Sequence, residues 1–340
     1  MAVLLVASER FELHVTPPGH PERTGRAEVF SGVALTWRER GGIVTEPKPA
    51  EVADLARVHS PAYIDRILAT AGRAVRLDPD TYTSPESVDV ARLAAGAVLA
   101  GVDHALQHDQ PAVALVRPPG HHAERDTAMG FCLFNNVAAG ASYARVRGLS
   151  RVAIVDFDVH HGNGTQAMFY EDPSVLYVSL HQYPYYPGTG GPAEIGTGSG
   201  TGFTVNAALE AGAADADYDH VMARLVVPIL EAFKPELLLL SAGFDAHQSD
   251  PLAAMRLTSD GFAAIMGRLW RVANRVCKGR CVAVTEGGYD LAALADGVRI
   301  VLDTLSRPDR DLPVVHGDPA KGREAIALVR PILQPYWPTI

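Results

Sequence analysis

Short apolar runs that break off into polar clusters constrain the fold of this chain more than any other feature of its sequence. Each of five such runs leads directly into a cluster that contains Gly, Asp, His or Tyr. The runs cover residues 112–116, 152–155, 175–178, 237–240 and 282–284. Continuous apolar runs of this length are typical of strands that are buried on both faces, as in parallel sheets.

Ala- and Leu-rich segments with helical spacing separate these runs. They cover residues 88–107, 136–147, 217–233 and 260–276. A strand followed by a helix and another strand implies a parallel sheet with right-handed crossovers. We therefore predict an α/β fold, a single open three-layer domain with a mainly parallel central sheet over residues 1–340. Residues 306–340 are expected to form a C-terminal segment that wraps this body or contacts a partner.

The polar clusters lie where each predicted strand ends. In open parallel sheets, ligands bind beyond the carboxyl ends of the strands, so we expect the five clusters to converge on one rim. Residues 186–202 are rich in glycine but lack the Lys-Ser/Thr pair of a phosphate-binding loop. We interpret them as a surface loop.

Charge and cysteine content exclude several classes of function. The 340 residues include 30 basic and 39 acidic side chains, a net charge of -9, without the long Lys/Arg cluster of a nucleic-acid binder. No apolar stretch approaches the roughly 18 residues of a membrane span, and we interpret MAVLLVASERFELH as the first buried strand rather than a leader. Three cysteines argue against a disulfide framework and fit a reducing compartment. We expect a cytoplasmic protein with no nucleic-acid or membrane partner, and the sequence leaves homo-oligomers open.

The segment Asp156-Phe-Asp-Val-His160 carries the first candidate site. In an extended strand alternate side chains share a face, so Asp156, Asp158 and His160 are expected to point the same way. Carboxylates that are crowded on a buried face repel unless cations lie among them. An Asp/His pair with a remote carboxylate would give three ligands and an open position, as catalytic zinc prefers. Asp245, at the end of another run, is the natural third ligand.

Two further clusters supply candidate catalytic side chains. His121 and His122 follow a rigid Pro-Pro-Gly turn, and paired imidazoles suit proton transfer in both directions. Asp156 and Asn163 are candidate partners that would tune them. Tyr289 follows two glycines, so its backbone can turn sharply and its hydroxyl could donate to an oxyanion. Taken alone each motif is more often structural, and only their combination indicates a site.

Together these motifs resemble those of the zinc-dependent histone deacetylase superfamily, nearest its class II and bacterial amidohydrolase members and their acetylpolyamine amidohydrolase relatives. The similar strings are RPPGHHAERDTAMGFCLFNN, VDFDVHHGNGTQAMFYEDPSVLYVSLH, SAGFDAHQSDPL and EGGYDL, with HPERTGR at 20–26. The resemblance covers roughly residues 10–305, in order and with family-like spacing. It implies the arginase/deacetylase-like form of the predicted fold.

The resemblance also implies a role for each matching position. The zinc ligands would be Asp158, His160 and Asp245. His122 would be the general base and His121 its electrostatic partner, although which of the two is the base is left open. Tyr289 would stabilise the tetrahedral oxyanion.

Structural monovalent cations, K⁺ or Na⁺, are a further family property that the resemblance implies. The inner site would be formed by Asp156, Ser179 and Leu180 with the backbone of Asp158 and His160. The outer site would be formed by Phe169, Asp172, Val175 and Phe203. A cation beside Asp156 would offset the buried charge of this carboxylate.

A narrow substrate tunnel completes the implied site. Its predicted lining is Gly130, Phe131, Tyr186, Leu252 and Gly288, with Asp80 at the rim. The family usually has phenylalanine where Tyr186 stands, and Tyr185 is a rival for this position. Leu252 stands where the polyamine-selective eukaryotic branch has a glutamate gatekeeper, so acyl-lysine is preferred over a polyamine.

These expectations define one main function and several alternatives. The main one is a zinc-dependent amidohydrolase that removes acetyl or other acyl groups from ε-N-acyl-lysine in proteins or peptides by metal-activated water. Acetylpolyamine hydrolysis is the alternative with the same chemistry. A non-catalytic acyl-lysine binding module and a two-manganese ureohydrolase come from other classes. The intact Asp/His/Asp set and Tyr289 argue against the module, and a ureohydrolase would need more bridging carboxylates.

Overall fold

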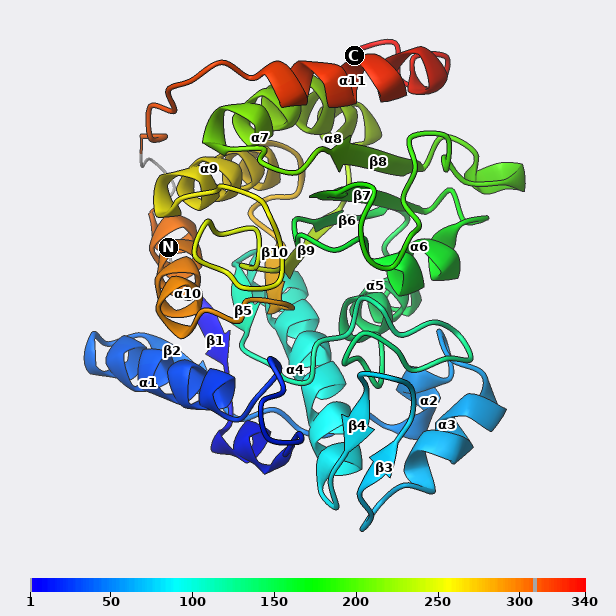
Figure 1. Ribbon diagram of the computed structural model, residues 1–340, viewed down its shortest axis with the longest axis vertical. Helices are drawn as coiled ribbons and strands as arrows, with labels where there is room; N and C mark the ends of the chain where they lie inside the picture. The colour runs from blue at the N-terminus through cyan, green and yellow to red at the C-terminus, as the bar shows by residue number, and fades with distance from the viewer. Residues whose placement is uncertain (1, 308–310) are drawn as a thin grey trace.

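The apolar runs form strands of one central sheet. The computed structural model describes residues 2–307 and 311–340, and in this part of the chain eight strands lie in the order β2-β1-β5-β10-β9-β6-β7-β8. Every neighbouring pair is parallel, which confirms the predicted α/β fold (Figure 1). The strands are β1 (Leu4–Val6), β2 (Ile43–Thr45), β5 (Ala112–Ala114), β6 (Val152–Asp156), β7 (Val175–Gln182), β8 (Thr204–Leu209), β9 (Leu237–Ala242) and β10 (Cys281–Thr285). A small antiparallel pair is formed by β3 (Val75–Arg76) and β4 (Tyr82–Thr83).

Helices connect the strands, and the four helical segments predicted from spacing are all helical. The helices are α1 (Gly25–Glu39), α2 (Val52–Leu55), α3 (Pro61–Leu68), α4 (Ser87–His108), α5 (Asn136–Val146), α6 (Asn163–Phe169), α7 (Asp215–Val221), α8 (Val227–Phe233), α9 (Ser259–Val276), α10 (Leu291–Ser306) and α11 (Ala320–Leu333). A π-helical turn, Met222–Val226, joins α7 to α8, and short 3-10 helices cover Glu9–Leu13 and Gly198–Gly200. No helix among the described residues has the length and apolar character that a bilayer crossing requires.

Both faces of the sheet are covered, which explains why its strands are continuously apolar. Successive side chains of a strand point to opposite faces. Leu237 and Leu239 of β9 pack in one core with side chains of α4 and α5. Leu238 and Leu240 pack in a second core with side chains of α9 and α10. The fold therefore has three layers, and polar side chains are left to the ends of the strands.

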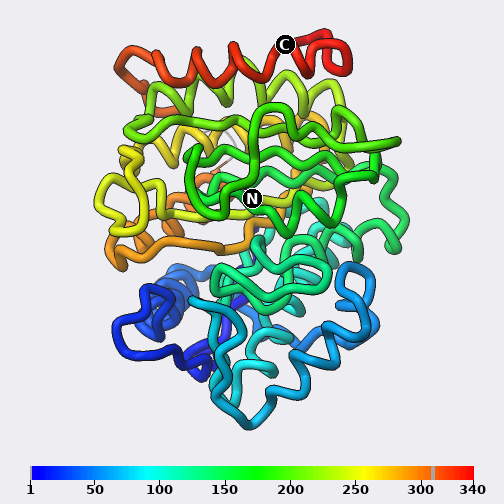
Figure 2. The backbone as a smooth tube through the Cα atoms, turned by 45° about the vertical axis from the view of Figure 1, so that its right-hand side comes forward, coloured from blue at the N-terminus to red at the C-terminus, as the bar shows by residue number. Residues whose placement is uncertain are grey.

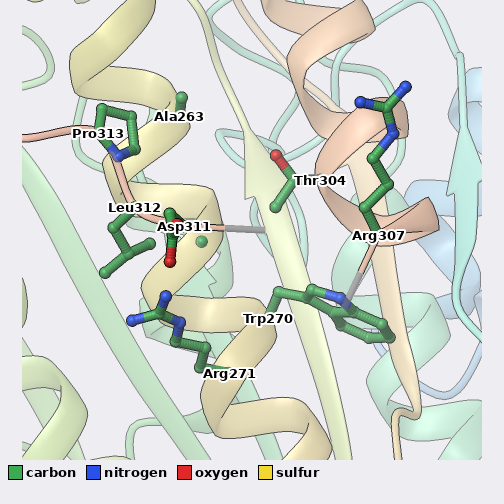
Figure 3. A pocket seen from close by; sticks show the side chains of 9 residues that line it. Ala263, Trp270, Arg271, Thr304, Arg307, Asp311, Leu312 and Pro313 are labelled. Carbon is green, nitrogen blue, oxygen red and sulfur yellow. The ribbon is translucent and has the colours of Figure 1, made fainter. Parts of the chain in front are cut away.

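The chain that follows α10 returns along α9. A Cβ atom built on Gly267 of α9 would lie 2.2 Å from the Leu312 Cδ2 atom, so this glycine gives the returning chain its space. Figure 3 shows residues 311–313 beside α9, at a small pocket that α10 also lines. The α11 helix then packs against α7 and β8 at one end of the molecule (Figure 2).

Trp337, just beyond α11, anchors this last segment. Its ring meets the rings of Phe203 and Phe233 edge-on, with 5.6 and 6.3 Å between centroids. Its Nε1–H donates to the Gly202 carbonyl at 2.7 Å, so the one polar atom of the buried indole is satisfied.

We expect Trp337→Ala to lower the free energy of unfolding by about 3 kcal/mol, because it leaves a cavity against two aromatic rings. Leu328→Ala on α11 is the control, since this leucine is 59% exposed and its loss should cost less than about 0.5 kcal/mol. Denaturant unfolding measures both. Equal effects of the two substitutions would show that Trp337 anchors nothing.

His59 is a fully buried histidine that the fold keeps neutral. Its Nε2 atom accepts the Asn135 N–H at 2.9 Å, so its Nδ1–H is the donor to the Glu124 carbonyl at 2.9 Å. Burial lowers the pKa of His59 to about 4, whereas a histidine in the unfolded chain has a pKa of about 6.5. Unfolding between these two pH values therefore takes up a proton.

The free energy of unfolding should consequently fall as the pH drops from 7.5 to 5, and His59 should account for about 2 kcal/mol of the fall. A His59→Gln variant cannot take up this proton, so its stability should depend less on pH by that amount. The exposed His316→Gln variant should follow the wild type. Denaturant unfolding at both pH values tests this, and an unchanged pH dependence in His59→Gln would contradict it.

Candidate active site

Four loops that follow neighbouring strands meet at one edge of the sheet. Strands β5, β10, β9 and β6 are adjacent and parallel, so their carboxyl ends lie side by side. The loop after β5 carries the tandem histidines, and the loop after β10 carries Tyr289. The loops after β9 and β6 carry Asp245 and the Asp158/His160 pair. The structure thus brings these polar clusters to one place.

Asp158, His160 and Asp245 each direct one polar atom to a common point. The His160 Nδ1 atom lies 3.2 Å from Asp158 Oδ1 and 3.2 Å from Asp245 Oδ2. One ligand atom from each of the three residues lies within 4.8 Å of the others. All three side chains are buried, so this group is enclosed at the floor of the site.

The expected strand geometry of this segment is wrong. Strand β6 ends at Asp156, and Asp158 and His160 lie in the loop that follows it. The Asp158 N–H donates to Asp156 Oδ1 at 3.2 Å, and the His160 N–H donates to Asp158 Oδ1 at 2.9 Å. Such side-chain acceptors compete with strand pairing and turn the backbone. The side chains of Asp158 and His160 therefore meet through a turn and not along one face of a strand.

Two glycines allow the backbone to approach the carboxylates. A Cβ atom on Gly287 would lie 2.0 Å from Asp245 Oδ2, and one on Gly243 would lie 2.1 Å from Asp158 Oδ2. The Gly287 N–H donates to Asp158 Oδ2 at 2.7 Å, and the Val159 N–H donates to Asp245 Oδ1 at 2.9 Å. The other oxygen of each carboxylate is left facing His160.

This donor set fits a divalent cation. A single Nδ1–H cannot point at two carboxylates at once, whereas ligands about 2.0–2.2 Å from a tetrahedral zinc ion lie about 3.3 Å apart. Burial, together with the charge of Asp158, raises the pKa of Asp245 to about 7. Burial opposes a charge on His160, yet the two carboxylates raise its pKa to about 10. The position thus favours positive charge, and two carboxylates with one imidazole are ligands that zinc accepts.

His121 is held on the carboxylate side of the site. Its Nδ1 atom lies 3.1 Å from Asp156 Oδ2, and its Nε2 atom lies 3.8 Å from Asp158 Oδ1. Burial opposes a charge on His121, but Asp158 and Asp156 outweigh it and raise its pKa to about 10. His121 is therefore the member of the pair that keeps its proton.

His122 is held in the opposite state. Its Nδ1 atom lies 2.8 Å from Asn163 Oδ1, and the Asn163 amide donates to Glu124 Oε1 at 2.7 Å, so its oxygen faces the histidine. His122 Nδ1–H is thus a donor, and Nε2 is left with a free lone pair. Burial, reinforced by the charges of His121 and His160, lowers the pKa of His122 well below its usual value. His122 is therefore neutral, and its Nε2 lone pair is available to accept a proton.

Glu286 is a site residue that the sequence argument missed. Its Oε2 atom accepts the N–H groups of Gly120 and His121 at 2.6 and 3.2 Å, and its Oε1 atom accepts the Ser241 hydroxyl at 3.2 Å. Burial raises the pKa of Glu286 to about 7. It fixes the turn that carries the tandem histidines. Its place just before the Gly-Gly-Tyr motif was the available signal.

Tyr289 brings its phenol to the same place. Its ring meets Phe131 edge-on with 5.8 Å between centroids, and the Arg26 guanidinium lies 5.2 Å from the ring centroid. Burial raises the pKa of the Tyr289 phenol well above its usual value. The hydroxyl therefore stays protonated and can act as a hydrogen-bond donor.

A pocket of about 170 Å³ leads to these groups. Its lining residues are Asp80, Pro119, His121, His122, Gly130, Phe131, His160, Tyr185, Tyr186, Leu252 and Tyr289. Both candidate tyrosines contribute: Tyr186 meets His122 edge-on at 5.2 Å between centroids, and Tyr185 stacks on His160 at 5.7 Å. Most of the predicted lining is therefore in place, and Tyr185 belongs to it as well.

Gly288 is the predicted lining residue that the pocket does not include. Its carbonyl instead accepts the Arg26 Nε–H at 2.8 Å, and Arg26 also donates to the Glu286 carbonyl. Arg26 and Arg117 both pair with the fully buried Glu22, at 3.1 and 2.7 Å. The HPERTGR motif thus supports the loop of Tyr289 from behind, a role that its sequence did not reveal.

The two predicted monovalent cation sites lie beside β6 and β7. Ser179 pairs with Asp156 across these strands, and the Asp156 Oδ2 atom accepts the Tyr177 hydroxyl at 3.2 Å. For the outer set, the Asp172 N–H donates to the Phe169 carbonyl at 3.0 Å, and the Phe203 carbonyl accepts the Tyr177 N–H at 2.9 Å. These residues are neighbours in space, and their binding of K⁺ or Na⁺ stays a prediction.

Comparison with known proteins agrees with this geometry. The histone deacetylase domain model matches residues 20–305. A probable deacetylase of Archaeoglobus fulgidus is 37% identical over 332 residues, which cover 92% of this chain and 91% of that protein. A histone deacetylase-like amidohydrolase of Pseudomonas aeruginosa is 43% identical over 263 residues, or 76% of this chain and 69% of that protein. The crystal structure of the HDA15 HD domain has a TM-score of 0.90 and 34% identity, covering 100% of this chain and 97% of that one.

The fold and these relatives define an enzyme class that hydrolyses amide bonds. Within it, the chain belongs to the histone deacetylase domain family. The resemblance inferred from the motifs is confirmed. Membership supports a deacetylase in broad terms.

We expect Gly287→Ala to weaken Zn²⁺ affinity by at least about tenfold, because the new methyl group would displace the Asp245 and Asp158 carboxylates. Gly32→Ala on α1 is the control, since a Cβ atom there meets nothing within 4 Å. Competition with a chelator measures affinity, and circular dichroism shows whether each variant folds. An unchanged Zn²⁺ affinity in a folded Gly287→Ala variant would contradict the assignment of Asp158 and Asp245 as ligands.

Proposed function

We propose that this protein is a zinc-dependent deacylase that acts on ε-N-acyl-lysine side chains of proteins or peptides. The observation that carries the proposal is the convergence of Asp158, His160 and Asp245 at the floor of a pocket that His122 and Tyr289 also line. These three residues would hold the ion. When bound there, zinc supplies a Lewis acid and lowers the pKa of a water ligand.

The tandem histidines divide the work of proton transfer. His122 has a free Nε2 lone pair and a depressed pKa, so it is the group that takes a proton from the attacking water. His121 keeps its proton towards Asp156 and contributes positive charge beside the reacting atoms. The proton on His122 then passes to the leaving amine, which completes hydrolysis of the amide.

Tyr289 supplies the hydrogen bond that the developing oxyanion needs. Its phenol stays protonated, and Tyr289 lines the same pocket as the two histidines. A donor that is already in place when charge develops stabilises the transition state more than the ground state. A module that only bound acylated chains would have no use for this arrangement.

The pocket walls favour an extended apolar chain. Phe131 and Tyr186 present aromatic rings, and Leu252 adds an apolar side chain near the same opening. These surfaces suit the four methylene groups of an acyl-lysine. Asp80 is the acidic group in this lining, and no gatekeeper carboxylate stands at Leu252 to attract the secondary ammonium of a polyamine. We also propose that K⁺ or Na⁺ binds near Asp156, where it would offset buried charge.

Turnover of acetyl-lysine peptide, acetylputrescine and acetylspermidine by zinc-loaded protein tests the substrate. We expect the peptide to be the best substrate, a chelator to abolish turnover, and added Zn²⁺ to restore it. Much faster polyamine turnover would make the protein an acetylpolyamine amidohydrolase. Activity that survives complete zinc removal would overturn the metal assignment.

Tyr289→Phe tests the catalytic role of the phenol. It should lower kcat by about 100-fold or more, with little change in affinity for the acetyl-lysine peptide, because one oxyanion donor is lost. Steady-state kinetics and peptide binding to the same preparation measure the two effects. Tyr82→Phe in the β3–β4 pair, outside the lining of this pocket, is the control. A Tyr289→Phe enzyme with wild-type kcat would assign the oxyanion donor elsewhere.

A further inference from the structure

We propose that Asp250 is a positioning residue that holds Tyr289 in place and ties it to Leu252, another residue of the pocket lining. The inference rests on the proposed role of Tyr289 as oxyanion donor. Asp250 lies outside the pocket lining and is 7% exposed, so it would act through its neighbours and not on the substrate.

The backbone at Tyr289 needs an acceptor that the helix cannot provide. Tyr289 lies just before α10, and Asp290 is the N-cap residue of this helix. The first N–H groups of a helix have no partner within it. The Asp290 side chain accepts the Ala293 N–H at 2.8 Å, so it serves the interior of the first turn. The N–H groups of Tyr289 and Asp290 precede the first residue of the helix, and both donate to Asp250 Oδ2, at 2.7 and 3.1 Å.

This bond fixes the backbone from which the phenol projects. Gly288, with φ of +123°, precedes Tyr289 and leaves the backbone without the usual steric limits on its conformation. The Asp250 carboxylate supplies the missing constraint, because a charged acceptor bonds backbone N–H groups strongly. The ring itself is held by packing against Phe131 and Arg26. Asp250 thus fixes the Cα end of the residue whose far end carries the reacting hydroxyl.

The second oxygen of the same carboxylate binds the backbone of Leu252, another residue of the pocket lining. Asp250 Oδ1 accepts the Leu252 N–H at 3.0 Å. The Leu252 carbonyl accepts the Tyr185 hydroxyl at 2.5 Å, and the Tyr185 ring stacks on His160. One carboxylate therefore links Tyr289 to Leu252 and, through it, to Tyr185. Since Leu252 lines the pocket where the methylene groups of the acyl-lysine would lie, a substrate that displaces Leu252 would also shift the backbone of Tyr289.

An asparagine at position 250 can keep the bonds to Tyr289 and Asp290 or the bond to Leu252, but not both. Its amide keeps one acceptor oxygen and turns the other position into a donor, which would face an N–H group and repel it. Asp250→Asn is therefore expected to lower kcat for the acetyl-lysine peptide by about tenfold or more, because small displacements of a reacting group cost this much. The KM should stay within about twofold, since Asp250 does not line the pocket.

A double-mutant cycle with Tyr289→Phe decides whether Asp250 acts through the phenol. If it does, Asp250→Asn should change kcat by less than about twofold once the hydroxyl is absent, because coupled residues are not additive. Asp296→Asn on α10 is the matched control, since this carboxylate is 58% exposed in its side chain and should leave kcat unchanged in both backgrounds. Bound zinc and thermal unfolding are measured on every variant. Should Asp250→Asn fail to fold, Asp250→Ser enters the same cycle with the same criterion.

The outcomes separate this inference from the function it rests on. An equal fold-loss in kcat in both backgrounds, with zinc retained, would overturn the positioning role and leave the deacylase proposal intact. A Tyr289→Phe enzyme that is as active as the wild type would instead overturn the oxyanion role and remove the basis of this inference. A loss that is confined to the background with an intact Tyr289 supports both.

Discussion

The Asp158 and Asp245 carboxylates are buried beside the His160 imidazole, and the residues around them must compensate for their charge. Removing Asp158 and Asp245 from water costs several kcal/mol for each charge unless partners compensate for it. Backbone N–H groups bind both oxygens of Asp158 and one oxygen of Asp245, and one oxygen of each carboxylate faces the His160 ring. The glycines at 243 and 287 exist where any larger residue would collide with these oxygens. The shape of the surrounding loops follows from this arrangement.

The loops of the site are joined by acidic side chains that accept N–H groups from a different loop. Asp158 does so for the loop after β10, and Asp245 for the loop after β6. Glu286 holds the turn of the tandem histidines in the same manner, and Asp250 holds Tyr289. Because each carboxylate bridges two loops, the strand ends and the reacting groups form one connected unit. Irregular loops thereby reach the precision that a regular element would give.

The strands and the ligand set were predictable from local patterns. A strand that is covered on both faces must be apolar throughout, so the apolar runs and the polar residues that follow them can be recognised in the sequence. The pairing of Glu22 with Arg117 was not predictable, because the two residues are 95 positions apart and neither of the motifs that contain them indicates that they meet. The turn at Asp158 also escaped prediction, since it depends on side-chain acceptors that compete with the ladder. Tyr185 and Tyr186 could not be ranked because both enter the pocket.

The order of the strands has a consequence for the making of the protein. Strand β10 is the last of the eight in sequence, yet it lies between β5 and β9 in the middle of the sheet. A nascent chain without β10 lacks the strand that pairs with both β5 and β9, and it also lacks the loop that carries Tyr289. A nascent chain that ends before β10 contains the Asp158 and Asp245 loops but not Tyr289. The complete site can therefore form only after β10 has been made and has paired with β5 and β9.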